Sequence, residues 1–360
     1  MRWGRALAAV VCVAAGVSQP VRLAAQRRVV EVRNLRPVAG TPGRFDTLMI
    51  RENAAPDSAR DFAVLTDVAV DSSGRILAVD TEGRRVIVLD RQGQGRGVVG
   101  RGGAGPGAFR RRYVGAVGAD GAVIVLDHRT LRLTYYDRDL GLVRTALLPS
   151  YLHATSMVAV GNELFIAGTL EAAGAEGKAI HVLTREGQYL RSFGRSVEAA
   201  NPLAQDFISG GILAPARDGG VWYTQYSPYL IERYAVDGTL QLQIRRPNDF
   251  LPSAEFAFRA QVSERGVVFQ PPAPHARAAA IQEFEDGTLL HQTLLPSRLV
   301  ITDVYRPSPG GEWALVGSYQ HPGPVLLRRG PGGTFLSLVA SEGIRHGGVM
   351  VVRFTPAPRR

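Results

Sequence analysis

Short apolar runs separated by turn residues dominate the first third of the chain. Four such runs follow one another near 65–70, 75–80, 85–90 and 95–100. Two of the intervening segments are Asp-Ser-Ser-Gly at 71–74 and Asp-Arg-Gln-Gly at 90–93. The glycine in each supplies the positive φ that tight hairpins need. The pattern therefore predicts a four-stranded antiparallel meander.

The meander recurs along the chain. Its third run ends at Asp90, then at Asp137, then at Thr184, a constant step of 47 residues. Looser copies end near Val236 and lie at 299–305 and 349–354. A four-stranded unit that repeats every ~40–50 residues is typical of propeller blades, which pack radially because one blade cannot bury its own faces. We therefore predict an all-β propeller of four-stranded antiparallel blades, with five to seven blades and six favoured.

The first two copies resemble the NHL repeats of bacterial six-bladed propellers. The resemblance rests on DSSGRILAVDTEGRRVIVLDRQG at 71–93 and on GRGVVGRGGAGPGAF at 95–109. It is recognisable to about residue 240 and weak beyond 245. It implies a ring closed by strands from the two chain ends. On that basis, residues 28–38 are expected to complete the blade that residues 349–354 help to build.

One repeat interval is longer than the others. The third runs of the fourth and fifth copies are about 69 residues apart, and the excess lies in a proline-rich segment at 245–278. Within it, Ser253 suits a helix N-cap and Gly266 a helix end, which predicts a short helix between them. Insertions of this kind map to loops on one face, often the binding face. The segment is either a binding element or a spacer packed on the rim.

Residues 1–25 differ from the rest of the chain. Arg2 and Arg5 form a basic start, Ala6 to Val17 is an apolar run of 12 residues, and the small residues of LAAQ at 23–26 end the segment. This order is typical of a secretory signal peptide. The run is shorter than the ~20 residues that a membrane-spanning helix needs, although an uncleaved anchor is the alternative. We predict a leader over 1–25, a propeller over 26–360, and export to the periplasm or the extracellular space.

The single cysteine bears on the same question. Cys12 lies inside the apolar run behind Val11, whereas a lipoprotein cysteine would follow the run and a small residue. Without the leader the chain would have no disulfide, no thiol nucleophile and no thiolate ligand. No later stretch approaches transmembrane length, so no membrane-spanning segment is expected after the leader is removed.

The net charge of +10 suggests anionic partners, but its composition limits the inference. Lys178 is the only lysine among 42 basic residues, and such an arginine bias is typical of a GC-rich genome. Export also argues against a nucleic-acid partner. A moderately basic surface remains, and it favours a small anionic ligand or an acidic protein.

The predicted topology places candidate residues on one face. In a propeller the second-to-third and fourth-to-first connections share a face, and the longer connections, including 100–113 and 245–278, gather there. Arginines beside aromatic rings suit carboxylates, phosphates or sugars. The candidates for ligand binding on this face are Arg84, Arg112, Tyr113, His128, Arg129, His153, Tyr226 and His291.

The sequence contains no local metal-binding or hydrolase motif. No two of the seven histidines have metal-ligand spacing. Amidating lyases with a related six-bladed fold bind zinc through histidines from different blades, and this resemblance makes His128, His153 and His291 the candidates for a divalent metal. Sugar-lactonase-like propellers use a Glu, Asn and Asp constellation, and no such motif is recognisable here. No other cofactor is expected.

Several residues have structural interpretations. The overlapping G-x-G-x-x-G motifs at 95–105 precede Pro106 and a strand rather than a helix, so they predict an inter-blade turn and no dinucleotide site. Asp80 is expected to accept backbone amides, and Trp222 and Trp313 to pack between blades. The favoured hypothesis is an exported non-catalytic binding propeller. The alternatives are a metal-dependent lyase or lactonase with its site on the axis, and a nucleic-acid-binding NHL propeller.

Overall fold

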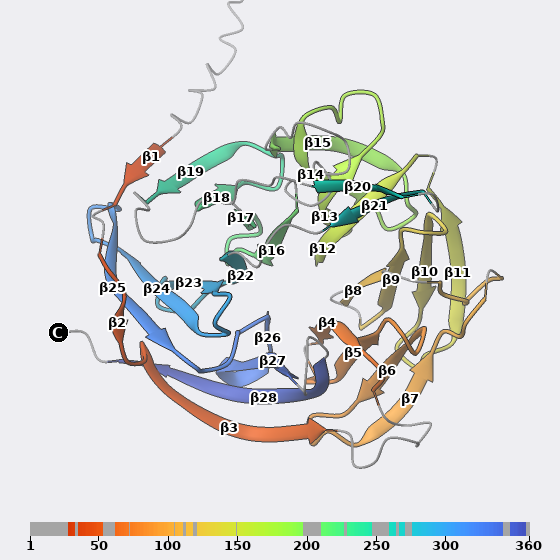
Figure 1. The fold of residues 1–360 in the computed structure, drawn as a ribbon, viewed down its shortest axis with the longest axis horizontal. Coiled ribbons are helices and arrows are strands. Elements are labelled where there is room, and N and C mark those ends of the chain that lie inside the picture. The colour runs from red at the N-terminus through yellow and green to blue at the C-terminus, as the bar shows by residue number, and fades with distance from the viewer. Residues whose placement is uncertain are drawn as a thin grey trace, which may run out of the picture.

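A computed structural model describes residues 28–32, 35–52, 62–71, 73–103, 105–110, 113–117, 121–148, 150–196, 210–226, 229–246, 259–263, 266–270, 276–340 and 346–357. These residues form a ring of six sheets around a central axis, with the first strand of each sheet nearest the axis (Figure 1). The predicted six-bladed all-β propeller is confirmed.

The first three blades are continuous antiparallel meanders. Their strands, given from the axis outward, are β4 (Leu65–Val70), β5 (Ile76–Asp80), β6 (Arg85–Leu89) and β7 (Gly95–Val99) in blade one; β8 (Tyr113–Val117), β9 (Val123–Asp127), β10 (Arg132–Tyr136) and β11 (Leu142–Leu147) in blade two; and β12 (Leu152–Val160), β13 (Glu163–Leu170), β14 (Lys178–Thr184) and β15 (Tyr189–Arg195) in blade three.

The last three blades contain N-terminal strands in addition to their own. Their meanders are β16 (Gly211–Pro215), β17 (Val221–Gln225), β18 (Leu230–Tyr234) and β19 (Leu240–Arg245) in blade four; β22 (Arg277–Glu283), β23 (Leu289–Leu294), β24 (Val300–Pro307) and β25 (Trp313–His321) in blade five; and β26 (Arg328–Arg329), β27 (Thr334–Ala340) and β28 (His346–Pro356) in blade six. The 3₁₀ turn η1 (Pro331–Gly333) connects β26 to β27. No helix in the described part of the chain is long and apolar enough to span a bilayer.

The repeat register predicted from the sequence is confirmed in every blade. The six segments taken as third strands correspond to β6, β10, β14, β18, β24 and β28. The predicted hairpins also form. Gly74 donates its amide to the Asp71 carbonyl and has a φ of 85°, and Gly93 does the same to Asp90 with a φ of 79°.

The two chain ends close the ring, but not through the expected segment. The strand β3 (Gly43–Glu52) pairs antiparallel with β28 and is the fourth strand of blade six. The prediction that residues 28–38 would take this place was wrong. In the closing strand, Phe45 lies against Phe354 and Met49 packs into the core between blades six and one.

Two short N-terminal strands instead cover the outer edges of two other blades. The strand β1 (Arg28–Glu31) pairs parallel with β19 of blade four, and β2 (Val38–Ala39) pairs parallel with β25 of blade five. Each adds a fifth strand. Edge strands expose unpaired amides and carbonyls, so the N-terminal segment satisfies part of these two edges as it approaches β3.

The connection between blades four and five contains a hairpin. The strands β20 (Arg259–Ser263) and β21 (Gly266–Gln270) pair with each other and with no other sheet. The prediction of a helix through this segment was wrong for Arg259–Ser263; residues 253–258 lie outside the described part. The hairpin is drawn in front of the ring, so Figure 1 faces the side of this fourth-to-first connection.

The hydrophobic core is divided into six clusters, one at each junction between neighbouring blades. Side chains along a strand alternate between its two faces, and each face meets another blade. The strands β5, β9 and β17 are therefore buried along their whole length. The rings of Trp222 and Trp313 meet edge to face at 5.5 Å between blades four and five, which confirms the packing role expected for them.

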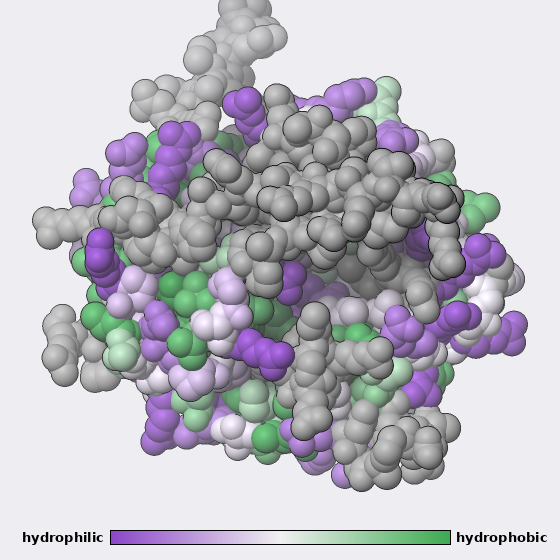
Figure 2. Space-filling view, in the orientation of Figure 1, coloured by the Kyte–Doolittle hydropathy of each residue, from purple (hydrophilic) through white to green (hydrophobic). Residues whose placement is uncertain are grey.

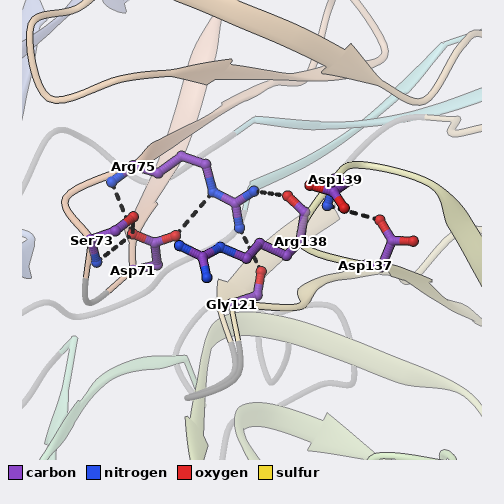
Figure 3. A network of polar contacts seen from close by, with 7 residues as sticks. All are labelled: Asp71, Ser73, Arg75, Gly121, Asp137, Arg138 and Asp139. Atoms are coloured by element: carbon purple, nitrogen blue, oxygen red, sulfur yellow. Dashed lines mark hydrogen bonds and ion pairs between the residues drawn. The ribbon is translucent and has the colours of Figure 1, made fainter.

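Polar contacts also join neighbouring blades, as the network in Figure 3 shows. Arg75, beside the first hairpin of blade one, is held by Asp71 (Nε to Oδ2, 3.0 Å). Its two Nη atoms donate to the carbonyls of Gly121 and Arg138 in blade two. The Arg138 side chain is exposed and takes no part in this contact, so it can be substituted without breaking the network.

Candidate functional site

The two faces of the ring differ in their connections. We call the face with the second-to-third and fourth-to-first connections the upper face and the other the lower face. The lower-face connections are mostly tight hairpins. In these hairpins the carboxylates of Asp71, Asp90 and Asp137 accept amides of their own turns. Asp80, on the upper face, accepts the amides of Ala63, Val64 and Gly83, as predicted.

The described connections of the two faces also differ in charge. Those of the upper face contain six basic and three acidic side chains, namely Arg84, Arg101, Arg110, Arg129, Arg246 and Arg298 against Glu82, Glu171 and Glu176. Arg246 is fully buried in an ion pair with Asp303, so only the other five basic side chains are exposed. Those of the lower face contain five basic and ten acidic side chains, namely Arg75, Arg91, Arg138, Arg185 and Arg217 against Asp71, Asp90, Asp137, Asp139, Glu186, Asp218, Asp237, Glu285, Asp286 and Glu312. In Figure 2, which views the same side as Figure 1, hydrophilic side chains are spread around the periphery.

Polar side chains from different blades meet at the axis. We define the channel-mouth cluster as Asp67 of β4, Thr155 of β12, Tyr226 after β17, Arg277 of β22 and Arg328 of β26. Four of them belong to first strands, which lie nearest the axis. Tyr226 comes from blade four, opposite blade one in the ring, yet Asp67 and Arg328 act on its hydroxyl electrostatically. The cluster therefore spans the axis.

Asp67 is the acidic member of this cluster. Its Oδ1 accepts the Val68 amide at 2.9 Å and Nη2 of Arg328 at 3.2 Å. The two side chains are only 13% and 14% exposed. Burial raises the pKa of Asp67, and the Arg328 guanidinium and the amides of Val68 and Gly115 oppose that rise. Its Oδ2 is buried and accepts no hydrogen bond of regular geometry among the described residues, because the nearby Gly115 amide does not meet that geometry.

Tyr226 is positioned by close packing on glycine. A Cβ on Gly210 would lie 2.5 Å from Cε2 of Tyr226 and 2.8 Å from Cγ2 of Thr155, so only glycine fits there. Burial raises the pKa of the Tyr226 hydroxyl, while the nearby Arg277 and Thr155 lower it. Oγ1 of Thr155 itself donates to the Gly211 carbonyl at 2.9 Å and accepts the Gly211 amide at 3.0 Å. Arg277 is exposed and forms no ion pair with a described carboxylate.

β-Bulges interrupt the pairing of three first strands close to the channel-mouth cluster. The pairing register shifts around Thr66 in β4, Thr155 in β12 and Ala279 in β22. A bulge leaves one residue unpaired and redirects its side chain, and bulges are frequent beside functional sites. Here they place Thr155 where it reaches Tyr226.

The predicted rim residues of blades one and two lie on the upper face. Arg84 and Arg129 are exposed in the second-to-third turns. Arg84 adopts a φ of 53°, and Leu131, which also directly precedes a third strand, has a φ of 50°. Left-handed conformations at non-glycine residues cost of order 1–3 kcal/mol. The Arg84 side chain lies against Gly102, where a Cβ would meet it at 3.1 Å.

Two of the predicted histidines meet between blades two and three. The rings of His128 and His153 are 5.1 Å apart, and His128 is largely buried. Arg112 lies outside the described residues, and Tyr113 is described only as the first residue of β8.

His291 lies elsewhere, inside the junction between blades four and five rather than on the exposed upper face. It is 1% exposed, and its Nε2 is 2.9 Å from Oγ1 of Thr224. Its ring lies 4.5 Å from that of Tyr229. The three histidines considered for a metal therefore do not converge. The described residues contain no group of three or more His, Cys, Asp or Glu side chains arranged to hold a metal ion.

A buried ion pair that the sequence did not reveal lies beside His291. Arg246 donates through Nη1 to Oδ2 of Asp303, and both side chains are fully buried. Tyr229 donates to the same carboxylate oxygen at 2.7 Å. Arg246 also donates to the carbonyl of Leu35, between β1 and β2. This network joins blade four, blade five and the N-terminal segment. Because neither charge is exposed, we interpret this network as structural.

The buried histidines predict an acid-sensitive fold. Burial lowers the pKa of His181 to about 4 and that of His291 to about 3, whereas an unfolded histidine titrates near ~6.5. The unfolded state therefore binds protons first, and stability is lost as the pH falls below ~6.5. Each histidine is expected to remove about 2 kcal/mol by pH ~5. Urea unfolding at pH 7.5 and 5 measures the loss, and an unchanged midpoint would contradict it.

Comparisons with known proteins support the fold. No family model and no curated protein matches the chain, so the NHL resemblance stays a prediction. A candidate exported protein from Bacteroides fragilis superposes with a TM-score of 0.59 at 11% identity, over 91% of this chain and 99% of that one. A catalytically inactive virginiamycin B lyase from Staphylococcus aureus, solved with quinupristin, reaches 0.46 at 13% identity over 81% and 80%. Identities this low show that the chain shares the propeller fold and no more.

Proposed function

We propose that this protein is an exported, non-catalytic binding propeller that takes a small anionic ligand on its upper face. The observation that carries the proposal is the charge separation between the two faces. The described upper connections are rich in arginine, and the lower ones contain twice as many acids as bases. Arginines gathered on one face create a field that attracts an anion. Arginine also presents paired donors that match carboxylate and phosphate.

Export rests on two independent supports. The first 25 residues have the charge, apolar run and small-residue exit of a signal peptide. The Bacteroides protein with the same fold is itself named as a candidate for export. The channel-mouth cluster supports a binding role, because Arg277 lies exposed at the axis next to the Tyr226 hydroxyl.

Matched charge reversals test the proposal. Arg84→Glu with Arg129→Glu changes the upper face, and Arg91→Glu with Arg138→Glu changes the lower face by the same net charge; all four side chains are exposed. With succinate as the probe in calorimetric titration, the upper pair is expected to weaken binding at least tenfold. The lower pair is expected to change it less than twofold at ~0.1 M salt, because distant exposed charges are screened there.

The outcomes separate a site from a general attraction. Equal losses in the two double variants would mean that only net charge draws the anion, and the upper-face site would be rejected. Absence of succinate binding in the unmodified protein would reject anion binding as such. Thermal unfolding of each variant confirms that the fold is intact.

A further inference from the structure

One acceptor in the channel-mouth cluster lacks a partner. Oδ2 of Asp67 is buried and accepts no hydrogen bond of regular geometry among the described residues. Oδ1 accepts hydrogen bonds from the Val68 amide and from Nη2 of Arg328. Native proteins satisfy nearly all buried polar atoms, with protein, water or ligand. A buried carboxylate oxygen without a hydrogen bond lowers the stability of the folded protein, and it does so more than a neutral acceptor would. This oxygen is therefore a place where a ligand's donor group would be favoured.

The same mouth offers donors for an anionic group. Arg277 is exposed, and both Arg277 and Arg328 act on the Tyr226 hydroxyl. A simple anion would bind Arg277 but leave Oδ2 of Asp67 without a hydrogen-bond donor. A simple cation would satisfy Asp67 but face two guanidinium groups. A ligand that carries both an anionic group and a hydrogen-bond donor complements the whole cluster.

The charge of the cluster decides which donor fits. Two arginines and one aspartate leave one positive charge in excess, which a ligand with one negative charge balances. A hydroxycarboxylate has that charge and donates through its neutral hydroxyl. An amino acid is neutral overall, and its ammonium group would add to the positive charge at the mouth.

We propose that the channel mouth recognises small hydroxycarboxylates, with the carboxylate held by Arg277 and the hydroxyl donating to Oδ2 of Asp67. This inference rests on the proposed function and names its ligand class. Tyr226 lies beside both groups, held by Thr155 and the close approach of Gly210.

Three small probes measure what the hydroxyl group of the ligand contributes to binding. Lactate and propionate differ only in the α-hydroxyl, and alanine replaces it with an ammonium group. In calorimetric or NMR titration, lactate is expected to bind about tenfold more tightly than propionate, the value of one hydrogen bond to a charged acceptor. Alanine is expected to bind more weakly than lactate. If alanine binds best, the ligand class is wrong.

Asp67→Asn tests the acceptor directly. Its amide can place a donor where Oδ2 stood, so the advantage of lactate over propionate should disappear while propionate still binds. Asp139→Asn removes the same charge from an exposed lower-face position and should preserve the advantage. Arg277→Gln should weaken both ligands together.

The two proposals fail in different ways. If succinate binds as described above but lactate and propionate are equal, or the lactate advantage survives Asp67→Asn, the hydroxycarboxylate inference is overturned and the anion site stands. If no anion binds, both are overturned. Thermal unfolding of Asp67→Asn controls for the loss of its contact with Arg328.

Discussion

Removing residues 1–52 is expected to abolish the cooperative unfolding transition of the ring. This truncation deletes β3, which pairs with β28 over nine residue positions and is the fourth strand of blade six. It also removes Phe45 and Met49 from the cores on either side of that blade. Removing a fully buried large side chain costs roughly 2–5 kcal/mol. Phe45 and Met49 are half-buried, but the strand pairing is lost with them, and the ring has only the ~5–15 kcal/mol that stabilises a whole domain.

A shorter truncation provides the control. Removing residues 1–40 deletes β1 and β2, which add fifth strands to blades four and five, together with the Leu35 carbonyl that Arg246 binds, but leaves β3 in place. It should lower the melting temperature but keep a single transition. Circular dichroism and calorimetry of both proteins decide the matter. A cooperative transition in the protein that lacks residues 1–52 would show that the ring does not need closure by β3.

Arg246→Leu is expected to destabilise the protein by about 3–5 kcal/mol, the usual cost of leaving one partner of a buried ion pair alone. Asp303 would keep a fully buried carboxylate, with Tyr229 and no guanidinium beside it. Burial already raises the pKa of Asp303, and Arg246 counters that rise. The substitution would also release the carbonyl of Leu35. Urea unfolding at pH 7.5 measures the loss.

The double variant Arg246→Met with Asp303→Leu distinguishes two explanations. If the cost of the single change comes from the unpaired charge, an apolar pair of similar size should recover most of the stability. A double variant as unstable as the single one would mean that the contacts made by the guanidinium across the two blades are themselves required. Asp139→Asn, an exposed change on the lower face, should leave stability within ~0.5 kcal/mol.

The blades could be predicted from the sequence because the information in each is local. A meander of short strands places its hairpin residues a few positions apart, and the 47-residue step between Asp90, Asp137 and Thr184 repeats that local pattern. The third strand of every blade was located correctly for this reason. Turn chemistry was local too, as with Gly74 and Gly93.

The position of a residue along a buried strand was harder to predict from the sequence. His291 was assigned to the upper face, but it is the third residue of β23, in which the first five of six residues are buried. A strand that is covered on both faces has no alternation of polar and apolar residues, so its ends cannot be located from the pattern. The helix predicted in the insertion was wrong for a related reason. Ser253 and Gly266 fit helix ends locally, but Arg259–Ser263 pair as β20.

The sequence by itself determined the fold class and the basic character of the chain and favoured six blades, since these follow from local periodicity and composition, but the structure was needed to fix the blade count. Only the tertiary structure decided which blades the N-terminal strands join, because β1, β2 and β3 pair with residues more than 200 positions away and short strands fit many edges. The channel-mouth cluster also needed the closed ring. Asp67, Thr155, Tyr226, Arg277 and Arg328 come from five different blades, and no spacing along the chain encodes their meeting at the axis.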